Sequence, residues 1–561
     1  MLNKTIIIKC IVIMLCTFSH ITLAEVVPPL KRSLQLTGNF GELRTNHFHT
    51  GLDFRASIGT PVYSVDEGYV SRISVSAGGY GNALYITHPS GITSVYAHLN
   101  SFIPRIQQEL EKRQYELQYY AVDINFAPEE LPVIKDEIVA YTGNRGSSGG
   151  PHLHFEIRDT ESENPLDPLN YYKGQIKDNR KPSIKAIAVI PQKGVINGKN
   201  KKFINNVVSE NGIKHLTRTI NAWGDIIVAL KAFDYMDGMS NIYGVHYVKL
   251  YMDDSLIYSS HIDTLSFAKG RQINSYIDSE EWLLNRSLFM KSYIAPGNTL
   301  NFYDDCVIKN RGVITIDEER IYKFRYEVSD YYGNKDICEF EILGVKYTIC
   351  DNIVKTAYNN EYKYQTENFS IDIPSFAMYE DWIPSYTKAD TILPKNYSVV
   401  HTINPYYEGV DKNCTISIKI DCDTLQDKTK YYIAQLHSVG KRQGQIKQEY
   451  ISQYKNVWLT AKTKSLGDYV VKADLTVPTV KYHGVVAGEV RITVKDMESG
   501  IKYFRGEIDG EFVLFTYDIK DKIARYKIDP KRYTKGHQYE IKFHVVDNCG
   551  NKKESKFRFT Y

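Results

Sequence analysis

Residues 149–158 read GGPHLHFEIR, and polar and apolar side chains alternate along this run from His152 onward. Alternation with a period of two is typical of a β-strand, because successive side chains point to opposite faces of the sheet. His152 and His154 should therefore lie on the same face. Two imidazoles in one environment indicate a polar, functional surface along this strand.

The sequence before the quoted run predicts a β domain with one helical insertion. Residues 34–98 alternate short apolar runs with glycine turns, which is the pattern of hairpins. Residues 104–120 change to a helical period, and Pro104 suits a first helical turn. The side chains at helical spacing are Ile106, Leu110, Arg113 and Leu117. We therefore expect an inserted helix, within a segment of about 104–131, before the strands resume.

Two patterns recur in the C-terminal two thirds of the chain. DNRKPSI (178–184) and DLTVPTV (474–480) share the spacing of an aspartate, a proline and a β-branched residue. IYKFRYEVSDYYGNK (321–335) resembles QYEIKFHVVDNCGNK (538–552), since both are alternating strands followed by Asp-x-x-Gly-Asn-Lys. Alternating strands punctuated by turns are typical of β-sandwich domains. Asp234, Asp237 and Asp330 could be calcium ligands, but aspartate caps loops more often, so no calcium site is predicted.

The first 24 residues have the pattern of a secretory signal peptide. Lys4 and Lys9 precede a short apolar run, and Thr22-Leu23-Ala24 resembles a cleavage site. The run is shorter than the ~20 residues that span a bilayer, and no later segment is apolar enough to do so. We expect an exported protein of the periplasm or cell envelope, or a secreted one, without a transmembrane segment after signal cleavage.

Charge and cysteine content exclude some classes of partner and cross-link. The chain of 561 residues has 69 basic and 66 acidic side chains and no basic stripe, so a nucleic-acid partner is not expected. Six cysteines follow the signal segment: Cys306, Cys338, Cys350, Cys414, Cys422 and Cys549. Cys414 and Cys422 bracket an alternating strand, so they should be too far apart to bond. Free, buried thiols are expected for most of the six.

Six of the fifteen histidines fall between residues 47 and 154, which indicates a metal site. Zinc is bound by imidazole and carboxylate groups in tetrahedral geometry, and catalytic sites keep one position for water. The run HTGLD supplies His49 and Asp53, and Gly51 between them should let the backbone turn so that both side chains converge.

Three motifs in this part of the chain resemble those of the M23 (lysostaphin- and LytM-type) zinc metallopeptidases. They are His49-x-x-x-Asp53, the run Tyr96-Ala97-His98-Leu99, and His152-x-His154. They occur in the family's order over about residues 35–170. The resemblance implies that His49, Asp53 and His154 hold Zn²⁺. It also implies that His98 and His152 are catalytic and assist a zinc-activated water, one as a base and the other as a donor to the oxyanion, without assigning which does which.

Several nearby residues are open to two interpretations. His47 could replace His49 as a ligand, and His88 is expected to be a surface or structural histidine. Glu156 could orient an imidazole or could be an exposed charge. Asn46 and Tyr96 could line the cleft, although Tyr96 could equally be a core aromatic. Gly143, Gly146, Gly149 and Gly150 should shape loops around a groove, which the helical insertion could restrict.

The expected fold class is mainly β. An antiparallel M23-type β-sheet peptidase domain with a short helical insertion should be followed by tandem, Ig-like β-sandwich domains. The expected ranges are 1–24 for the signal peptide, 25–175 for the peptidase domain, and 182–348, 349–475 and 478–561 for the sandwiches.

The expected function is that of an exported zinc metalloendopeptidase that hydrolyses peptide bonds in peptidoglycan, the substrate class that the resemblance implies. An envelope protein partner could bind through the sandwich domains. The alternative is a non-catalytic envelope protein that uses an M23-like domain to bind or regulate another wall hydrolase.

Overall fold

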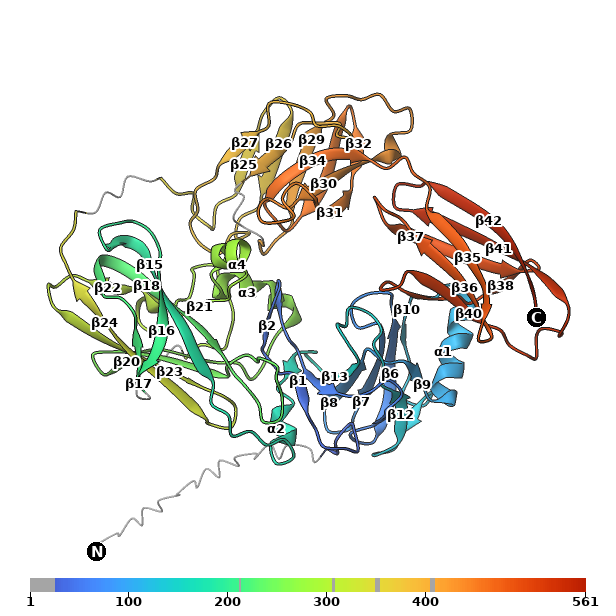
Figure 1. Cartoon of the computed structure of the whole chain (residues 1–561), viewed down its shortest axis with the longest axis horizontal. Helices are drawn as coiled ribbons and strands as arrows, with labels where there is room; N and C mark the ends of the chain where they lie inside the picture. Colours follow the sequence, from blue (N-terminus) through green and yellow to red (C-terminus); the bar gives the residue numbers. More distant parts are fainter. Residues whose placement is uncertain (1–25, 211–212, 305–307, 349–353, 404–408) are drawn as a thin grey trace, which may run out of the picture.

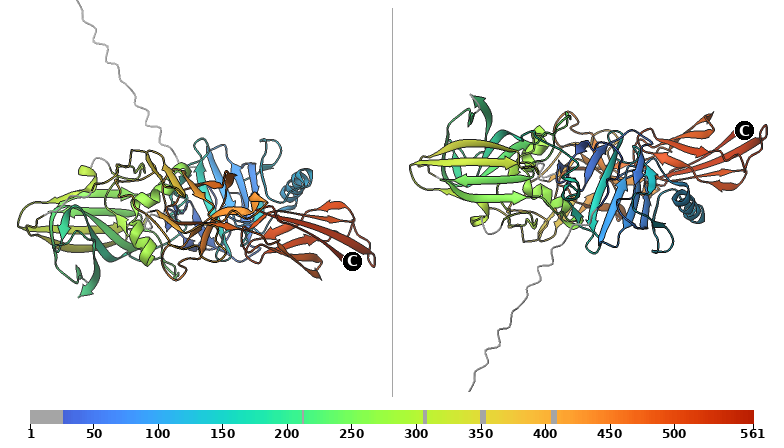
Figure 2. Two further views of the ribbon diagram at one scale, coloured as in Figure 1. Left: turned by 90° about the horizontal axis from the view of Figure 1, so that it is seen from above. Right: turned by 90° about the horizontal axis from the view of Figure 1, so that it is seen from below.

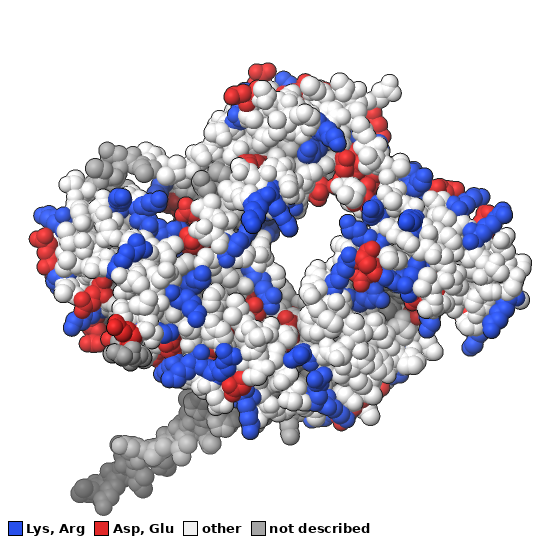
Figure 3. Space-filling view, in the orientation of Figure 1, with Lys and Arg blue, Asp and Glu red and all other residues white. Residues whose placement is uncertain are grey.

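The computed structural model describes residues 26–210, 213–304, 308–348, 354–403 and 409–561, so the predicted signal peptide, Cys306 and Cys350 lie outside the described residues. The protein is mainly β. We refer to residues 26–176, 178–348, 354–474 and 475–561 as the N-terminal, second, third and fourth domains. They surround a central opening (Figures 1 and 3), and the views of Figure 2 show the whole assembly to be elongated and flat.

The N-terminal domain is built on a nine-stranded antiparallel sheet. Its strands along the main path are β1 (Leu36–Gly38), β4 (Leu52–Arg55), β13 (His152–Asp159), β8 (Ile92–Ala97), β7 (Asn82–Thr87), β6 (Gly68–Val75) and β10 (Val122–Asn125). Two short strands extend it, β11 (Pro132–Val133) on β6 and β14 (Pro165–Leu166) on β13. The smaller elements are β5 (Pro61–Tyr63), β12 (Ile138–Tyr141), β9 (Ser101–Phe102), the hairpin of β2 (Leu43–Arg44) and β3 (His47–Phe48), and the helix α2 (Leu169–Tyr172).

The predicted inserted helix is α1, which begins at Pro104 and ends at Leu117. Ile106 and Leu110 are buried as expected. Leu117 is 63% exposed, however, and the buried residue of the third turn is Gln114, whose side-chain amide donates to the Tyr120 carbonyl. The apolar spacing thus predicted the helix correctly but not the buried side of its last turn.

The second domain is a ten-stranded sheet with short helices inserted after β20. Its strands are β17 (Ile213–Leu216), β16 (Phe203–Glu210), β15 (Ser183–Ile196), β18 (Ile220–Phe233), β24 (Lys335–Gly344), β23 (Ile321–Ser329), β19 (Tyr247–Met252) and β20 (Ser255–His261), with β21 (Met290–Lys291) and β22 (Ile314–Ile316) beside β18. The helices are η1 (Phe267–Gln272), α3 (Ile273–Tyr276), α4 (Ser279–Asn285) and η2 (Asn310–Gly312).

The third and fourth domains each contain two sheets. The third has β25 (Tyr362–Gln365), β26 (Phe369–Ile373), β29 (Cys414–Lys419), β33 (Trp458–Thr463) and β32 (Gln453–Lys455) in one sheet, and β27 (Tyr386–Lys388), β28 (His401–Ile403), β34 (Gly467–Ala473), β30 (Tyr431–Leu436) and β31 (Ile446–Ile451) in the other, with η3 at Lys428–Lys430. The fourth has β35 (Thr479–Val486), β36 (Glu489–Lys495), β40 (Ile523–Lys527) and β39 (Thr516–Asp518), and β38 (Glu511–Val513), β37 (Ile501–Ile508), β41 (Gln538–Asp547) and β42 (Lys552–Thr560).

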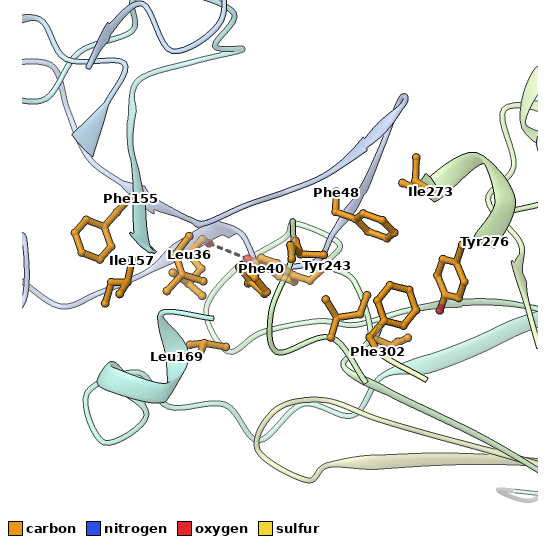
Figure 4. Close-up of a cluster of buried hydrophobic side chains, with 14 of the residues drawn as sticks. Leu36, Phe40, Phe48, Phe155, Ile157, Leu169, Tyr243, Ile273, Tyr276 and Phe302 are labelled. Carbon is orange, nitrogen blue, oxygen red and sulfur yellow. Dashed lines mark hydrogen bonds between the residues drawn. The ribbon is translucent and has the colours of Figure 1, made fainter. Parts of the chain in front are cut away.

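One hydrophobic core runs from the N-terminal domain into the second domain (Figure 4). Phe48 of β3 packs edge-on against Phe302, with ring centroids 5.8 Å apart. The Tyr243 hydroxyl donates to the Leu36 carbonyl at 2.8 Å. The two domains therefore share buried apolar surface, whereas the third and fourth domains each have a separate main core.

Cys338, Cys414 and Cys549 are free and buried, while Cys422 is free and exposed. The prediction that Cys414 and Cys422 do not bond is therefore confirmed. In the described parts of the chain, none of the helices has the length and apolar character needed to cross a bilayer.

Candidate metal centre and cleft

The register of three neighbouring strands places the predicted site residues in one row. Asp53 of β4 pairs with His154 of β13, and His154 pairs with Ala97 of β8. His98 directly follows Ala97, and His152 lies two residues before His154 on the same strand. The odd-numbered neighbours Leu153, Phe155 and Ile157 are buried in the core. Because side chains alternate along β13, the imidazoles of His152 and His154 lie on the face opposite to this core.

His49, Asp53 and His154 bring three donor atoms together. His49 Nε2 lies 3.1 Å from Asp53 Oδ1 and 3.1 Å from His154 Nδ1, and His154 Nδ1 lies 2.9 Å from Asp53 Oδ1. The group could hold a metal ion. Burial alone would raise the pKa of Asp53, but the surrounding imidazoles hold it well below its ordinary value. Asp53 is therefore a carboxylate that attracts positive charge to this point.

His49 is positioned by the loop that follows β3. Its Nδ1 lies 2.7 Å from the Asn39 carbonyl. A carbonyl can only accept, so Nδ1 carries the proton and the Nε2 lone pair faces the cluster. Gly51 serves a purpose other than the predicted turn. A Cβ at Gly51 would lie 2.3 Å from the Phe155 carbonyl oxygen, so glycine is required by the close approach of the two backbones.

His154 is held from behind by a buried carboxylate. Its Nε2 donates to Glu156 Oε1 at 2.8 Å, which leaves Nδ1 for the cluster. Glu156 is completely buried, so the exposed-charge interpretation is wrong. Thr50 and Tyr80 both donate to Glu156 Oε1 at 2.5 Å. Burial raises the pKa of Glu156, but the hydrogen bond from His154 and the charge of Arg158 lower it to about 2.

His98 and His152 flank the cluster without joining it. His98 Nδ1 donates to the Arg145 carbonyl at 2.8 Å, and His152 Nδ1 donates to the Gly150 carbonyl at 2.8 Å. Their Nε2 atoms are therefore left with lone pairs, and that of His152 lies 3.4 Å from Asp53 Oδ1. The two ring centroids are 4.9 Å apart. Burial and the neighbouring imidazoles of His154 and His152 lower the pKa of His98 to about 3.

The cluster opens into a cleft of about 970 Å³ between the N-terminal and second domains. One wall contains Asn46 and the glycine loop with Gly149 and Gly150, and the other contains Phe267 and Arg271 of η1. In the described chain no residue of α1 lines this cleft. The helix faces the fourth domain instead, as described below, so it does not cover the groove.

The other residues considered in the sequence analysis lie outside the cluster of donor atoms. His47 is exposed, and its Nδ1 bonds the Thr45 carbonyl at 2.9 Å, outside the cluster. His88 is buried between the Glu67 carbonyl and the Ser94 hydroxyl. Tyr96 is fully buried in the core. Gly143 and Gly146 allow backbones to approach closely, since a Cβ at either would lie 2.4 Å from another backbone atom.

Several residues of the site were not predicted. Tyr80 and Arg158 hold Glu156, and the side chain of Asn39, whose carbonyl fixes His49, is bound to the second domain. The alternation of β13 could have placed Glu156 and Arg158 on the imidazole face. The aromatic and basic residues of η1 gave no such signal, because they reach the cleft through a domain contact.

Comparison with known proteins identifies two parts of the chain. Residues 47–115 match the profile described as peptidase family M23, which includes His49, Asp53 and His98 and ends within α1. Residues 354–474 match the Zu5-like domain.

Several relatives that align with the N-terminal domain carry peptidase names. Over 128 residues the chain is 32% identical to DD-carboxypeptidase/endopeptidase Mpg of Neisseria meningitidis serogroup B, covering 23% of this chain and 24% of that protein. It is 31% identical over 137 residues to peptidoglycan DD-endopeptidase ShyB of Vibrio cholerae, covering 23% and 26%. The chain thus spans about a quarter of the length of these curated relatives.

A solved structure, the catalytic domain of the antimicrobial peptidase lysostaphin from Staphylococcus simulans, is 25% identical and covers 24% of this chain and 89% of that chain, with a TM-score of 0.17. The family match and the relatives both fall on the domain that carries the cluster. Residues 47–115 of the N-terminal domain thus match peptidase family M23, and the relatives named above align with the same domain.

Proposed function

We propose that this protein is an exported zinc metalloendopeptidase that hydrolyses peptide bonds of peptidoglycan. The observation that carries the proposal is the convergence of His49 Nε2, Asp53 Oδ1 and His154 Nδ1, with His98 and His152 beside them. The export step rests on the sequence pattern of residues 1–24. Sequencing the N-terminus of the mature protein tests it, with Glu25 expected as the first residue.

The donor set fits zinc. Two imidazole nitrogens and one carboxylate oxygen make a typical catalytic zinc site with one open position. Zn–ligand bonds of 2.0–2.1 Å at tetrahedral angles imply ligand separations of about 3.3 Å, close to the 2.9–3.1 Å seen here. When bound, zinc would polarise the peptide carbonyl and make water acidic enough to supply a nucleophile near neutral pH.

The two flanking histidines supply the proton chemistry. Each has Nδ1 fixed on a backbone carbonyl, so each presents a basic Nε2 in the neutral form. One takes a proton from the attacking water and returns it to the leaving amine. The other, once protonated, donates to the oxyanion of the tetrahedral carbon. Their proximity, with ring centroids 4.9 Å apart, allows both to serve a single scissile bond.

The cleft suits an extended peptide. The exposed loop of Gly149 and Gly150 offers little side-chain bulk on one wall, and Phe267 and Arg271 offer apolar and cationic contacts on the other. The guanidinium of Arg271 is already bound to the Val410 and Lys464 carbonyls of the third domain, which fixes that wall. The wall peptides of peptidoglycan are proposed as substrates because two relatives carry endopeptidase names.

Metal analysis and digestion of purified peptidoglycan by the full chain test the proposal. One zinc per chain is expected, and mass spectrometry should find new peptide termini in the digest. His154→Ala should lose both metal and activity. His152→Ala should keep the metal and lose about 10²–10⁴-fold in turnover, the usual contribution of a general acid or base.

His47→Ala is the matched control for metal binding, because it removes an imidazole of β3, two residues before His49, that lies outside the cluster. It should keep one zinc per chain. Release of the metal by His152→Ala would reverse the assignment of the histidine pair. A full chain without stoichiometric zinc would favour the non-catalytic alternative, an envelope protein that binds or regulates another wall hydrolase.

A further inference from the structure

Three buried carboxylates meet where the N-terminal domain joins the second domain. Asp178 lies in the segment between α2 and β15, Asp234 directly follows β18, and Asp330 directly follows β23. One oxygen from each lies within 4.8 Å of the other two. The residues are 7%, 4% and 2% exposed. Three acidic groups from one linker and two strand ends thus converge out of contact with solvent.

Two of the carboxylate oxygens have no hydrogen-bond partner among the residues that the structure describes. Asp178 Oδ1 accepts from the Arg180 and Asp237 amides at 3.0 and 3.2 Å, but Asp178 Oδ2 has no donor. Asp234 Oδ1 is also buried without a donor. Asp330, by contrast, accepts from the amide and the side chain of Asn334. An uncompensated buried carboxylate is costly, so these oxygens indicate a missing positive partner.

Among the described residues, no basic side chain donates a hydrogen bond to these two oxygens. The guanidinium of Arg180 donates instead to the Met236 and Met239 carbonyls at 3.1 and 2.9 Å. Burial and the mutual repulsion of the carboxylates raise the pKa of Asp178 to about 6 and that of Asp234 to about 8.

We propose that Asp178, Asp234 and Asp330 bind one Ca²⁺ ion that fixes the second domain to the segment leading from the N-terminal domain. Hard cations take oxygen ligands, and Ca²⁺ accepts several carboxylates at 2.3–2.6 Å with flexible geometry. A limit of 4.8 Å between ligand oxygens is about twice that bond length, so all three can touch one ion. Zinc sites usually include nitrogen or sulfur donors, which this cluster lacks among the described residues, and Mg²⁺ usually keeps several waters.

An equivalent cluster lies where the third domain joins the fourth domain and serves as a comparison. Asp474, Asp496 and Asp547 occupy the same places relative to the repeated motifs. Asn551 binds the Asp547 carboxylate and the Asp474 carbonyl, just as Asn334 binds Asp330 and the Asp178 carbonyl. The domains therefore share this local architecture.

The two clusters differ in one side chain. In the fourth domain Ser499 donates to Asp474 Oδ2 through both its amide and its hydroxyl, at 3.0 and 2.6 Å. The second domain has Asp237 at the corresponding place, and an ionised carboxylate cannot donate. The Asp237 Oδ2 atom instead accepts hydrogen bonds from the backbone amide and the side chain of Asn179, so this carboxylate points away from the cluster. In the described parts of the two clusters, the buried carboxylate oxygens without a hydrogen-bond partner belong to Asp178 and Asp234.

The zinc-loaded full chain, freed of calcium, provides the test. Calorimetric titration with CaCl₂ should show one site, with a dissociation constant on the order of 0.1–1 mM, as in extracellular modules. Saturating Ca²⁺ should raise the temperature of the unfolding transition that contains the second domain. Asp234→Asn should abolish both effects. Asp496→Asn, the matched substitution in the fourth domain, should leave both unchanged.

Calcium-free stability distinguishes a ligand from a structural cap. Neutralising Asp234 relieves repulsion, so calcium-free Asp234→Asn should melt at or above the wild-type temperature; a cap would make it melt lower with or without Ca²⁺. The proposal is overturned if the wild type does not bind Ca²⁺, if Asp234→Asn still binds it, or if only Asp496→Asn loses it. Equal shifts with Mg²⁺ would overturn the choice of ion. None of these outcomes depends on peptidase activity.

Discussion

The N-terminal domain meets the second and the fourth domain through surfaces of opposite character. Against the second it contributes to one continuous hydrophobic core (Figure 4). Against the fourth it makes mostly exposed contacts. The ring of Tyr119 stacks on Tyr503 at 6.2 Å, Arg505 donates to the Gln118 side chain at 2.7 Å, and Arg145 lies 3.4 Å from Asp518. Apolar burial stabilises far more than exposed polar contacts.

The site depends on the first of these surfaces. The side chain of Asn39 bonds Gly244 of the second domain in both directions, and the Asn39 carbonyl accepts from His49 Nδ1. The second domain thus helps to hold a proposed metal ligand and also provides a wall of the cleft. The fourth domain closes the ring from the other side (Figure 1). We therefore expect the N-terminal and second domains, which together form the site, to stay associated. The contact between the N-terminal and fourth domains should be able to separate.

The largest expected effect is at the shared core. Phe302 of the second domain is buried and packs edge-on against Phe48 and Tyr276, with ring centroids 5.8 and 5.2 Å away. Phe302→Ala should reduce the free energy of unfolding by about 3–5 kcal/mol, the usual cost of removing a buried phenyl ring. Hydrogen exchange on the full chain should show that β13 and β18 lose protection together.

A control for this substitution is Ile134→Ala, since Ile134 is 70% exposed and surface changes usually stay within about 0.5 kcal/mol. If Phe302→Ala weakened protection in β18 alone, the N-terminal and second domains would not unfold as a unit. The interface with the second domain would then be no stronger than the interface with the fourth domain.

A second effect concerns a buried acid at the same junction. Asp167 of the N-terminal domain is 1% exposed, its carboxylate accepts from the Leu169 amide, and His246 of the second domain lies 3.9 Å away. Burial raises its pKa to about 7. The folded chain therefore binds this proton more tightly than the unfolded chain. Stability should fall as pH rises from about 4 to about 7 and then level off.

Asp167→Asn should remove this fall in stability with rising pH. The raised pKa corresponds to about 4 kcal/mol above pH 7, and the unpaired amide of asparagine offsets part of this, so a net gain on the order of 2 kcal/mol is expected at pH 8. Thermal unfolding at pH 5 and pH 8 measures the difference. Asp263→Asn should instead lose stability, because the hydrogen bond from His246 holds the pKa of Asp263 below its ordinary value. Parallel pH profiles for Asp167→Asn and the wild type would refute the account.

Local pattern predicted the site better than it predicted what surrounds it. The alternation in β13 placed His152 and His154 on one face because alternation along a strand is a local property, and the structure brings His49, Asp53 and His154 close together. The same alternation places Glu156 beside the imidazoles, but whether that face meets solvent depends on contacts from Thr50 and Tyr80. Phe267 reaches the cleft from more than a hundred residues away. No period in the sequence encodes such a contact.

The repeated motifs in the C-terminal part of the chain likewise predicted local structure but not contacts between distant residues. The Asp-x-x-Gly-Asn spacing correctly indicated two related units, and Asn334 and Asn551 play the same part in each. The sequence did not show which aspartates converge, because Asp178 comes from a linker whose position is fixed only by the folded junction. Nor could spacing reveal that Asp237 turns away.

The smallest expected effect is at the contact with the fourth domain. Asp518→Ala removes the ion pair with Arg145, whose side chains are 26% and 15% exposed and 3.4 Å apart. A long pair that is still open to solvent is worth about 0–1 kcal/mol. The free energy of unfolding should therefore change little. Small-angle scattering should show a larger radius of gyration, because the fourth domain moves away from α1. Salt of about 1 M should have a similar effect on the wild type, since it shortens the screening length to about 3 Å. Arg72→Ala breaks a shorter but more exposed pair, with Asp123, inside the N-terminal domain, so it should also cost little and should not change the radius. The peptidase site should survive Asp518→Ala, because His98 is held by the Arg145 carbonyl rather than by its guanidinium. A loss of several kcal/mol at an unchanged radius would instead mean that the fourth domain is as firmly joined to the N-terminal domain as the second.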